Sequence, residues 1–150
     1  MEQTRTLKRE DTSAKAEYPT IARKSVDSVT ASCVNELMNA RTSFHKLHLK
    51  VKGPGSYAAH KALNELYDAL PGHADDLAEG FQGASEKLLD ITDTTPRKLS
   101  SVKDSLNYIR ELIEMISDLQ SKMPYSEIVN ELDNVKSTLN STKYKLTFLE

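Results

Sequence analysis

Apolar side chains recur at steps of three and four residues along four stretches of the chain, the spacing that places them on one face of a helix. The first stretch covers residues 26–51 and stops at the Gly-Pro-Gly turn of residues 53–55. The second follows this turn, with Ser56 as its expected N-cap. Pro71 and Gly72 interrupt its pattern. Because an interior proline removes one backbone hydrogen bond, we expect a kink or a break there.

A second pair of helices is predicted further along the chain. The third helix opens near Ser101, which forms a pattern like a capping box with Asp104, and Pro124 separates it from the fourth. The stretch between the second and third helices, about residues 80–99, is the least periodic. Four amphipathic helices predict an all-α protein. The two short links and the one long middle link indicate how its helices are connected. The expected fold is a ferritin-like four-helix bundle with a long middle crossover.

Composition divides the chain into two parts. Residues 1–24 carry scattered charge and few large apolar side chains, so we expect a flexible N-terminal tail there and a bundle domain over residues 25–150. The net charge of -2 does not indicate a nucleic-acid or membrane surface. No apolar run approaches the ~20 residues of a membrane span. The single cysteine, Cys33, cannot form an internal disulfide, which favours the cytoplasm.

The four histidines all lie on the first predicted hairpin. His48 and His60 stand five residues before and five residues after the glycines of the turn, so an antiparallel hairpin sets them at similar height. Asn64 shares a helix face with His60, and Glu79 shares one with Asp75. Asn64 and Asp75 are ~16 Å apart along a helix, too far to reach one ion. A two-fold dimer could bring the two halves together.

The stretch HLKVKGPGSYAAHKALNELYDALPGHADDLAE, residues 48–79, resembles the Dps mini-ferritin family of DNA-protecting, iron-storing proteins. That family shares a hairpin of the form H-x-N-V-x-G-x-x-F/Y-x-x-x-H-x-x-x-D, then D-x-x-x-E eleven residues on. The matching positions here are His48, Val51, Gly53, Tyr57, His60, Asn64, Asp75 and Glu79.

The resemblance implies a ferroxidase site shared between two subunits. Iron would be bound by His48, His60 and Asn64 of one chain with Asp75 and Glu79 of another, and the histidines and carboxylates would support its oxidation. Asn64 stands where the family usually has a carboxylate, and an amide is a neutral, weaker ligand. Restoring the carboxylate is expected to tighten metal binding.

The resemblance also implies partners. The expected assembly is a two-fold dimer and a dodecameric shell, and DNA binding through the basic residues of the tail is a further expectation. The excess of two positive charges in the tail is slight, which favours a solvated linker. Ferritin-like proteins of this kind also occur in phage genomes, and a phage origin would fit.

A second hypothesis from another class is a non-catalytic ferritin-like protein that uses the bundle for assembly or binding. Several residues also have ordinary interpretations. Cys33 and Tyr67 lie on apolar stripes and are expected in the core. His45 and His73 are expected on the surface. Two acidic residues of the second helix, Asp68 and Asp76, are interpreted as solvated charges.

Overall fold

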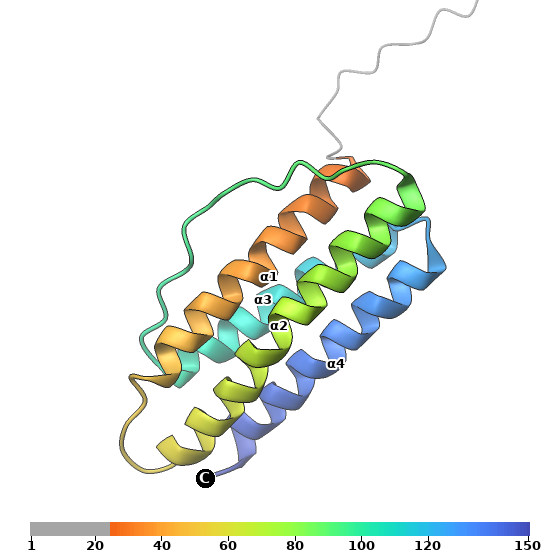
Figure 1. Ribbon diagram of the computed structural model, residues 1–150. Helices are drawn as coiled ribbons and strands as arrows, with labels where there is room; N and C mark the ends of the chain where they lie inside the picture. The colour runs from red at the N-terminus through yellow and green to blue at the C-terminus, as the bar shows by residue number, and fades with distance from the viewer. Residues whose placement is uncertain (1–24) are drawn as a thin grey trace, which may run out of the picture.

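The computed structural model describes residues 25–150, which fold into four α-helices with no strand among them. The helices are α1 (Val26–His48), α2 (Ser56–Ser85), α3 (Val102–Lys122) and α4 (Ser126–Phe148). They form a single bundle (Figure 1). The prediction of an all-α four-helix bundle is confirmed. The predicted tail, residues 1–24, lies outside the described residues.

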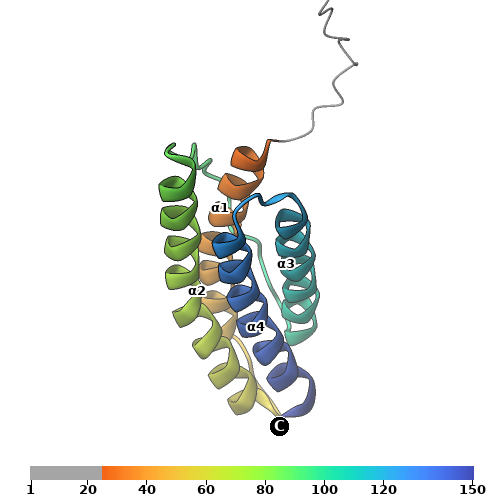
Figure 2. The same cartoon turned by 90° about the vertical axis from the view of Figure 1, so that its right-hand side faces the viewer.

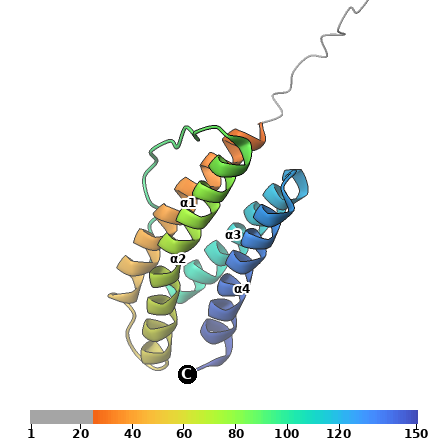
Figure 3. The same ribbon diagram turned by 45° about the vertical axis from the view of Figure 1, so that its right-hand side comes forward.

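Each helix packs against two others around one core. α2 lies between α1 and α4, and α3 lies between α4 and α1, with the most extensive contact between α1 and α2 (Figure 3). Phe44, Phe81 and Tyr108 are the largest fully buried side chains, and leucine and isoleucine fill most of the remaining core. No helix in residues 25–150 is long and apolar enough to cross a membrane.

α2 runs through Pro71 as one continuous helix, so of the two outcomes expected there, a kink or a break, the break does not occur. Pro71 and Gly72 face solvent, whereas Leu70 and Ala74 on either side of them are fully buried. Core packing on both sides of the proline holds the helix together. Figure 2 shows the axis of α2 bending in its middle part, the expected effect of an interior proline.

The helix starts follow one sequence prediction and depart from another. The Oγ of Ser101 accepts a hydrogen bond from the backbone N–H of Asp104 at 3.1 Å, so this predicted cap is confirmed. At the start of α2 the N-cap is Gly55 and not Ser56. Gly53 and Gly55 have φ of 88° and 77°, and only glycine adopts this left-handed conformation without strain. The left-handed turn therefore places Gly55 at the N-cap position, and the expected cap, Ser56, becomes the first residue of α2.

Residues 86–101 connect α2 to α3 without regular structure and run back along α1 (Figure 1). Side chains of α1 hold this crossover. Asn35 and Asn39 donate from Nδ2 to Thr94 Oγ1 at 2.7 and 2.8 Å, and Ser43 donates from Oγ to the carbonyl of Arg97 at 2.6 Å. An irregular segment cannot pair all its own backbone groups. Asn39, which also donates to the carbonyl of Thr94 at 3.1 Å, and Ser43 supply two of the missing donors.

The Arg97 side chain fixes the end of the crossover against α3. Its guanidinium lies 4.2 Å from the centre of the Tyr108 ring and its Nη1 lies 2.5 Å from a carboxylate oxygen of Glu111. The hydroxyl of Tyr108 donates to Glu36 on α1, and its ring stacks on Phe44 at 5.3 Å. Burial, and then the Glu36 contact, raise the pKa of Tyr108. The tyrosine thus stays protonated and ties α3 to α1 beneath the crossover.

Cys33 lies in the core with no exposed surface, as its place on the apolar stripe predicts. Burial raises the pKa of its thiol to about 12, with a smaller contribution from Glu36. The thiolate is the nucleophilic form of cysteine. Cys33 is therefore a small core residue at neutral pH.

The crossover contacts predict a specific stability difference between two adjacent threonines. Thr94→Val should lower the free energy of unfolding by about 1–2 kcal/mol, because it removes the acceptor of the buried Asn35 amide. The matched control is Thr95→Val, since Thr95 is exposed and makes no side-chain hydrogen bond among the described residues. Its effect should stay below about 0.5 kcal/mol. Urea unfolding followed by circular dichroism measures both, and equal losses would show that the crossover is not held at Thr94.

Candidate functional site

His48 and His60 meet across the first hairpin, as their spacing around the turn predicts. Their rings are stacked, with centres 4.4 Å apart. Tyr67 joins them from the next turns of α2, with its ring 4.8 Å from that of His48, and His45 stacks on Tyr67 at 4.2 Å. We call these four residues the histidine clasp. It lies between α1 and α2, next to the turn that joins them.

Both ring nitrogens of His48 are engaged. Nδ1 lies 2.6 Å from the carbonyl oxygen of His45, and because a carbonyl only accepts, Nδ1 carries the proton. Nε2 is then the acceptor in the neutral ring and receives the hydroxyl of Tyr67 at 3.2 Å. His48 is buried, so each of these bonds satisfies a group that water does not reach. The expected core position of Tyr67 is confirmed, and its hydroxyl has a defined partner.

His60 completes the end of α1 from the neighbouring helix. Its Nδ1 lies 2.8 Å from the carbonyl oxygen of His48, the last residue of α1. The final carbonyls of an α-helix have no intrahelical donor. The His45 and His48 carbonyls therefore both receive imidazole N–H groups. The structure gives the two histidines beside the turn a capping role.

The remaining predicted ligands lie further along α2. Asn64 donates from Nδ2 to Asp68 Oδ2 at 2.7 Å, and Asp75 and Glu79 are exposed. His60 and Asp75 are fifteen residues apart, or ~22 Å along the helix. One chain therefore does not bring the five residues together. Residues 25–150 contain no group of three or more His, Cys, Asp or Glu side chains able to hold a metal ion.

Iron binding by His48, His60, Asn64, Asp75 and Glu79 across two chains stays a prediction. Asp68 and Asp76 are exposed, as expected for solvated charges, although Asp68 receives the Asn64 amide.

His73 is not the free surface residue that the sequence suggested. It is half-buried, and its Nε2 lies 2.8 Å from Oγ1 of Thr138 on α4. Burial lowers its pKa, while the nearby carboxylates of Asp76 and Glu131 act in the opposite direction. His45 is also half-buried, because its ring rests on Tyr67. Both histidines help to join helices.

A second feature lies at the same end of the bundle, where the α1–α2 turn meets the end of α4. Several large apolar side chains remain exposed there. They are Leu49, Tyr57, Tyr144, Phe148 and Leu149. Tyr57 and Phe148 are 74% and 72% exposed, and the rings of Tyr144 and Phe148 lie 5.7 Å apart. We call these five residues the hairpin-end surface.

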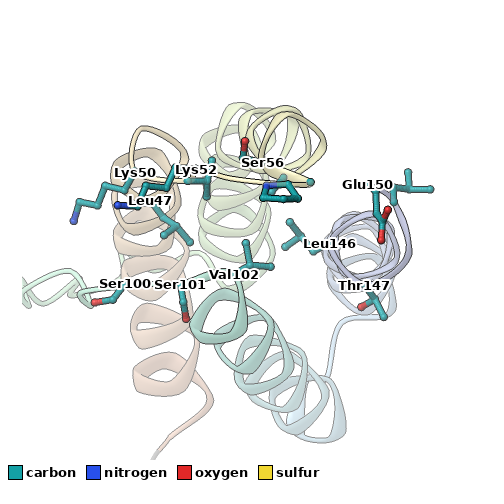
Figure 4. Close-up of a pocket in the computed structure, with 15 residues that line it drawn as sticks. Leu47, Lys50, Lys52, Ser56, Ser100, Ser101, Val102, Leu146, Thr147 and Glu150 are labelled. Carbon is teal, nitrogen blue, oxygen red and sulfur yellow. The ribbon is translucent and has the colours of Figure 1, made fainter.

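A cavity of about 500 Å³ opens at this end of the bundle. Figure 4 shows Leu47, Val102 and Leu146 between the helix ends, where they form its apolar floor. Charged side chains line its opening. Lys50 and Lys52 lie on the α1 side, and Glu150 lies on the α4 side (Figure 4). The cavity combines an apolar interior with opposite charges on its two sides.

Sequence reasoning missed the hairpin-end surface. The apolar spacing of the fourth stretch continues to Leu149, yet α4 ends at Phe148 and Leu149 is 46% exposed. A usable signal was present in the chain. Tyr144 and Phe148 are four residues apart and lie off the stripe that contains Leu139 and Leu146. A second apolar stripe near a helix end indicates a surface that packs against something else.

The fold and site together define a helical-bundle protein with a capped hairpin and an apolar end. Residues 48–146 match the model of a family of unknown function, DUF5856, and the chain belongs to this family. It is also similar to an uncharacterized 14.6 kDa protein from the mobD-ri intergenic region of Enterobacteria phage T4. The two are 27% identical over 111 residues, which cover 74% of this chain and 82% of that protein. No solved structure matches the chain.

The resemblance to Dps mini-ferritins is wrong, because the matching family is DUF5856 and no Dps or ferritin-like family is found. The misleading spacing has structural causes. His48 and His60 flank the turn at equal distance because they cap one helix from both sides of a hairpin. Asp75 and Glu79 are four apart because both belong to the solvent face of α2. The expected relation to phage proteins is confirmed by the T4 relative.

The clasp predicts that one tyrosine hydroxyl matters and another does not. Tyr67→Phe should lower the free energy of unfolding by about 1–2 kcal/mol, because Nε2 of the buried His48 loses its donor. Tyr57→Phe removes the same hydroxyl from an exposed ring and should change it by less than about 0.5 kcal/mol. Urea titrations of the two variants test this. A Tyr67→Phe variant as stable as the wild type would refute the hydrogen bond.

Proposed function

We propose that this protein is a non-catalytic helical module that works by binding another protein through its hairpin-end surface. The observation that carries the proposal is the presence of five exposed large apolar side chains on the elements at one end of the bundle, where a cavity with an apolar floor also opens. Monomeric proteins rarely expose large contiguous apolar patches, and those they expose are often binding sites.

The size of this surface supports a protein partner. Five side chains with 46% to 74% of their surface exposed, at roughly 200 Å² each, present roughly 600 Å² of mostly apolar area. Burying a large apolar side chain is worth about 1.5–3 kcal/mol. Tyr57, Tyr144 and Phe148 are also of the residue types enriched at the centres of protein interfaces.

The histidine clasp supports a non-catalytic role. The nitrogens of His48 and the Nδ1 of His60 are committed to helix ends and to Tyr67. These bonds stabilise the hairpin that presents Leu49 and Tyr57 on either side of the turn. The clasp thus positions the binding surface.

Two further features of the proposal concern the scaffold and its setting. Two hairpins joined by one crossover support a ferritin-like connectivity for this bundle. The T4 relative and the single buried cysteine support action in the cytoplasm of a phage-infected cell.

Photo-crosslinking in bacterial cells tests the binding role. A benzophenone amino acid in place of Tyr57 or Tyr144 should give discrete crosslinked proteins, because these side chains are expected to contact the partner. The control is the same probe in place of Leu88, which is 87% exposed but lies on the crossover. Phe148→Ser should abolish the crosslinks from Tyr57, and Leu88→Ser should leave them intact. Equal crosslinking from all three positions, or none from the hairpin end, would contradict the proposal.

A further inference from the structure

We infer that the hairpin-end surface docks against the same surface of a second copy of this chain, giving an end-to-end dimer with two-fold symmetry. This inference rests on the proposed function and names its partner. Three observations support a second copy: the charges around the cavity, the available apolar area, and the presence of exposed aromatic residues on the helix ends that adjoin at its opening.

The charges around the cavity are self-complementary. Lys50 and Lys52 lie on one side of the opening and Glu150 on the other, and all three are exposed (Figure 4). None of them takes part in the ion pairs found among residues 25–150. A two-fold axis that runs between the two sides places the lysines of one copy opposite Glu150 of the other. The same pairing then occurs twice, as two-fold symmetry requires.

The apolar area fits a small dimer interface. The roughly 600 Å² of the hairpin-end surface approaches the ~800 Å² that each partner buries in an interface of standard size. The cavity and its polar edge add to this area. An end-to-end contact therefore has enough surface for a stable dimer.

Two of the exposed aromatic residues belong to the helix ends that line the cavity. Gly55, at the start of α2, approaches the backbone of Glu150, so the first turn of α2 and the end of α4 adjoin at the opening. Tyr57 and Phe148 belong to these two elements, and each directly follows in sequence a residue that lines the cavity, Ser56 and Thr147. The two-fold arrangement that pairs the lysines with Glu150 sets this side of the opening against the Lys50 and Lys52 side of the other copy.

The first experiment measures self-association of the purified full chain by sedimentation equilibrium. The wild type should form dimers. Phe148→Ser together with Tyr57→Ser should raise the dimer Kd at least about tenfold, as expected for two aromatic residues central to an interface. Leu88→Ser is the control for loss of an exposed apolar side chain and should leave the Kd unchanged. Circular dichroism verifies that each variant is folded.

The second experiment tests the charge pairing between copies. One variant carries Lys50→Glu with Lys52→Glu, and the other carries Glu150→Lys. Each alone should dimerise at least about tenfold more weakly than the wild type, because like charges then face each other. An equimolar mixture should regain dimers, since both contacts of the mixed dimer pair opposite charges. Contacts within one chain cannot produce this recovery.

The outcomes separate the inference from the proposed function. A wild-type chain that stays monomeric at several hundred micromolar, variants that dimerise normally, or a mixture no better than its components would each overturn the two-fold contact. In any of these cases, crosslinks from the hairpin end to a different protein would keep the proposed binding role. Loss of all such crosslinks would remove both.

Discussion

The C-terminal carbonyl groups of α1 impose the constraint on which the hairpin depends. A helix leaves its last carbonyls without donors, and burying them unpaired costs free energy comparable to a lost hydrogen bond. Here the chain turns immediately after α1, and the backbone N–H of Lys50 donates to the carbonyl of Leu47, so the carbonyls of His45 and His48 need other donors. The imidazoles of His48 and His60 supply these donors, and the hydroxyl of Tyr67 donates to the remaining ring nitrogen of His48. These hydrogen bonds add to the apolar packing that holds α1 against α2 along their length.

The crossover meets the same constraint in another way. Its irregular backbone passes along α1, where Asn39 and Ser43 donate to the carbonyls of Thr94 and Arg97. Asn35 and Asn39 also donate to the Thr94 hydroxyl. Arg97 and Tyr108 then fix its end to α3. With both connections held by side chains of the bundle, the turn and the end of α4 can present apolar groups to solvent without loosening the core. The hairpin-end surface thus lies on elements that side-chain hydrogen bonds of the bundle hold in place.

The sequence contained most of the fold and little of the site. Helix periodicity predicted the four helices, and the Ser101 and Asp104 pattern predicted the start of α3, because both signals are local. The equal height of His48 and His60 followed from the hairpin. Their role did not follow, because capping depends on which carbonyls lack donors in three dimensions. The exposed positions of Phe148 and Leu149 depend on where α4 ends relative to the turn, which periodicity does not report.

The protonation of the clasp imidazoles tests the central claim most directly. Nitrogen-15 NMR spectra of the histidine rings, recorded above pH 8, distinguish which ring nitrogen carries the proton. The capping role predicts neutral rings with the proton on Nδ1 in both His48 and His60, because each Nδ1 faces a carbonyl of α1. A neutral ring with its proton on Nε2 in either residue would contradict the account, since this tautomer leaves the facing carbonyl, of His45 or of His48, without its donor.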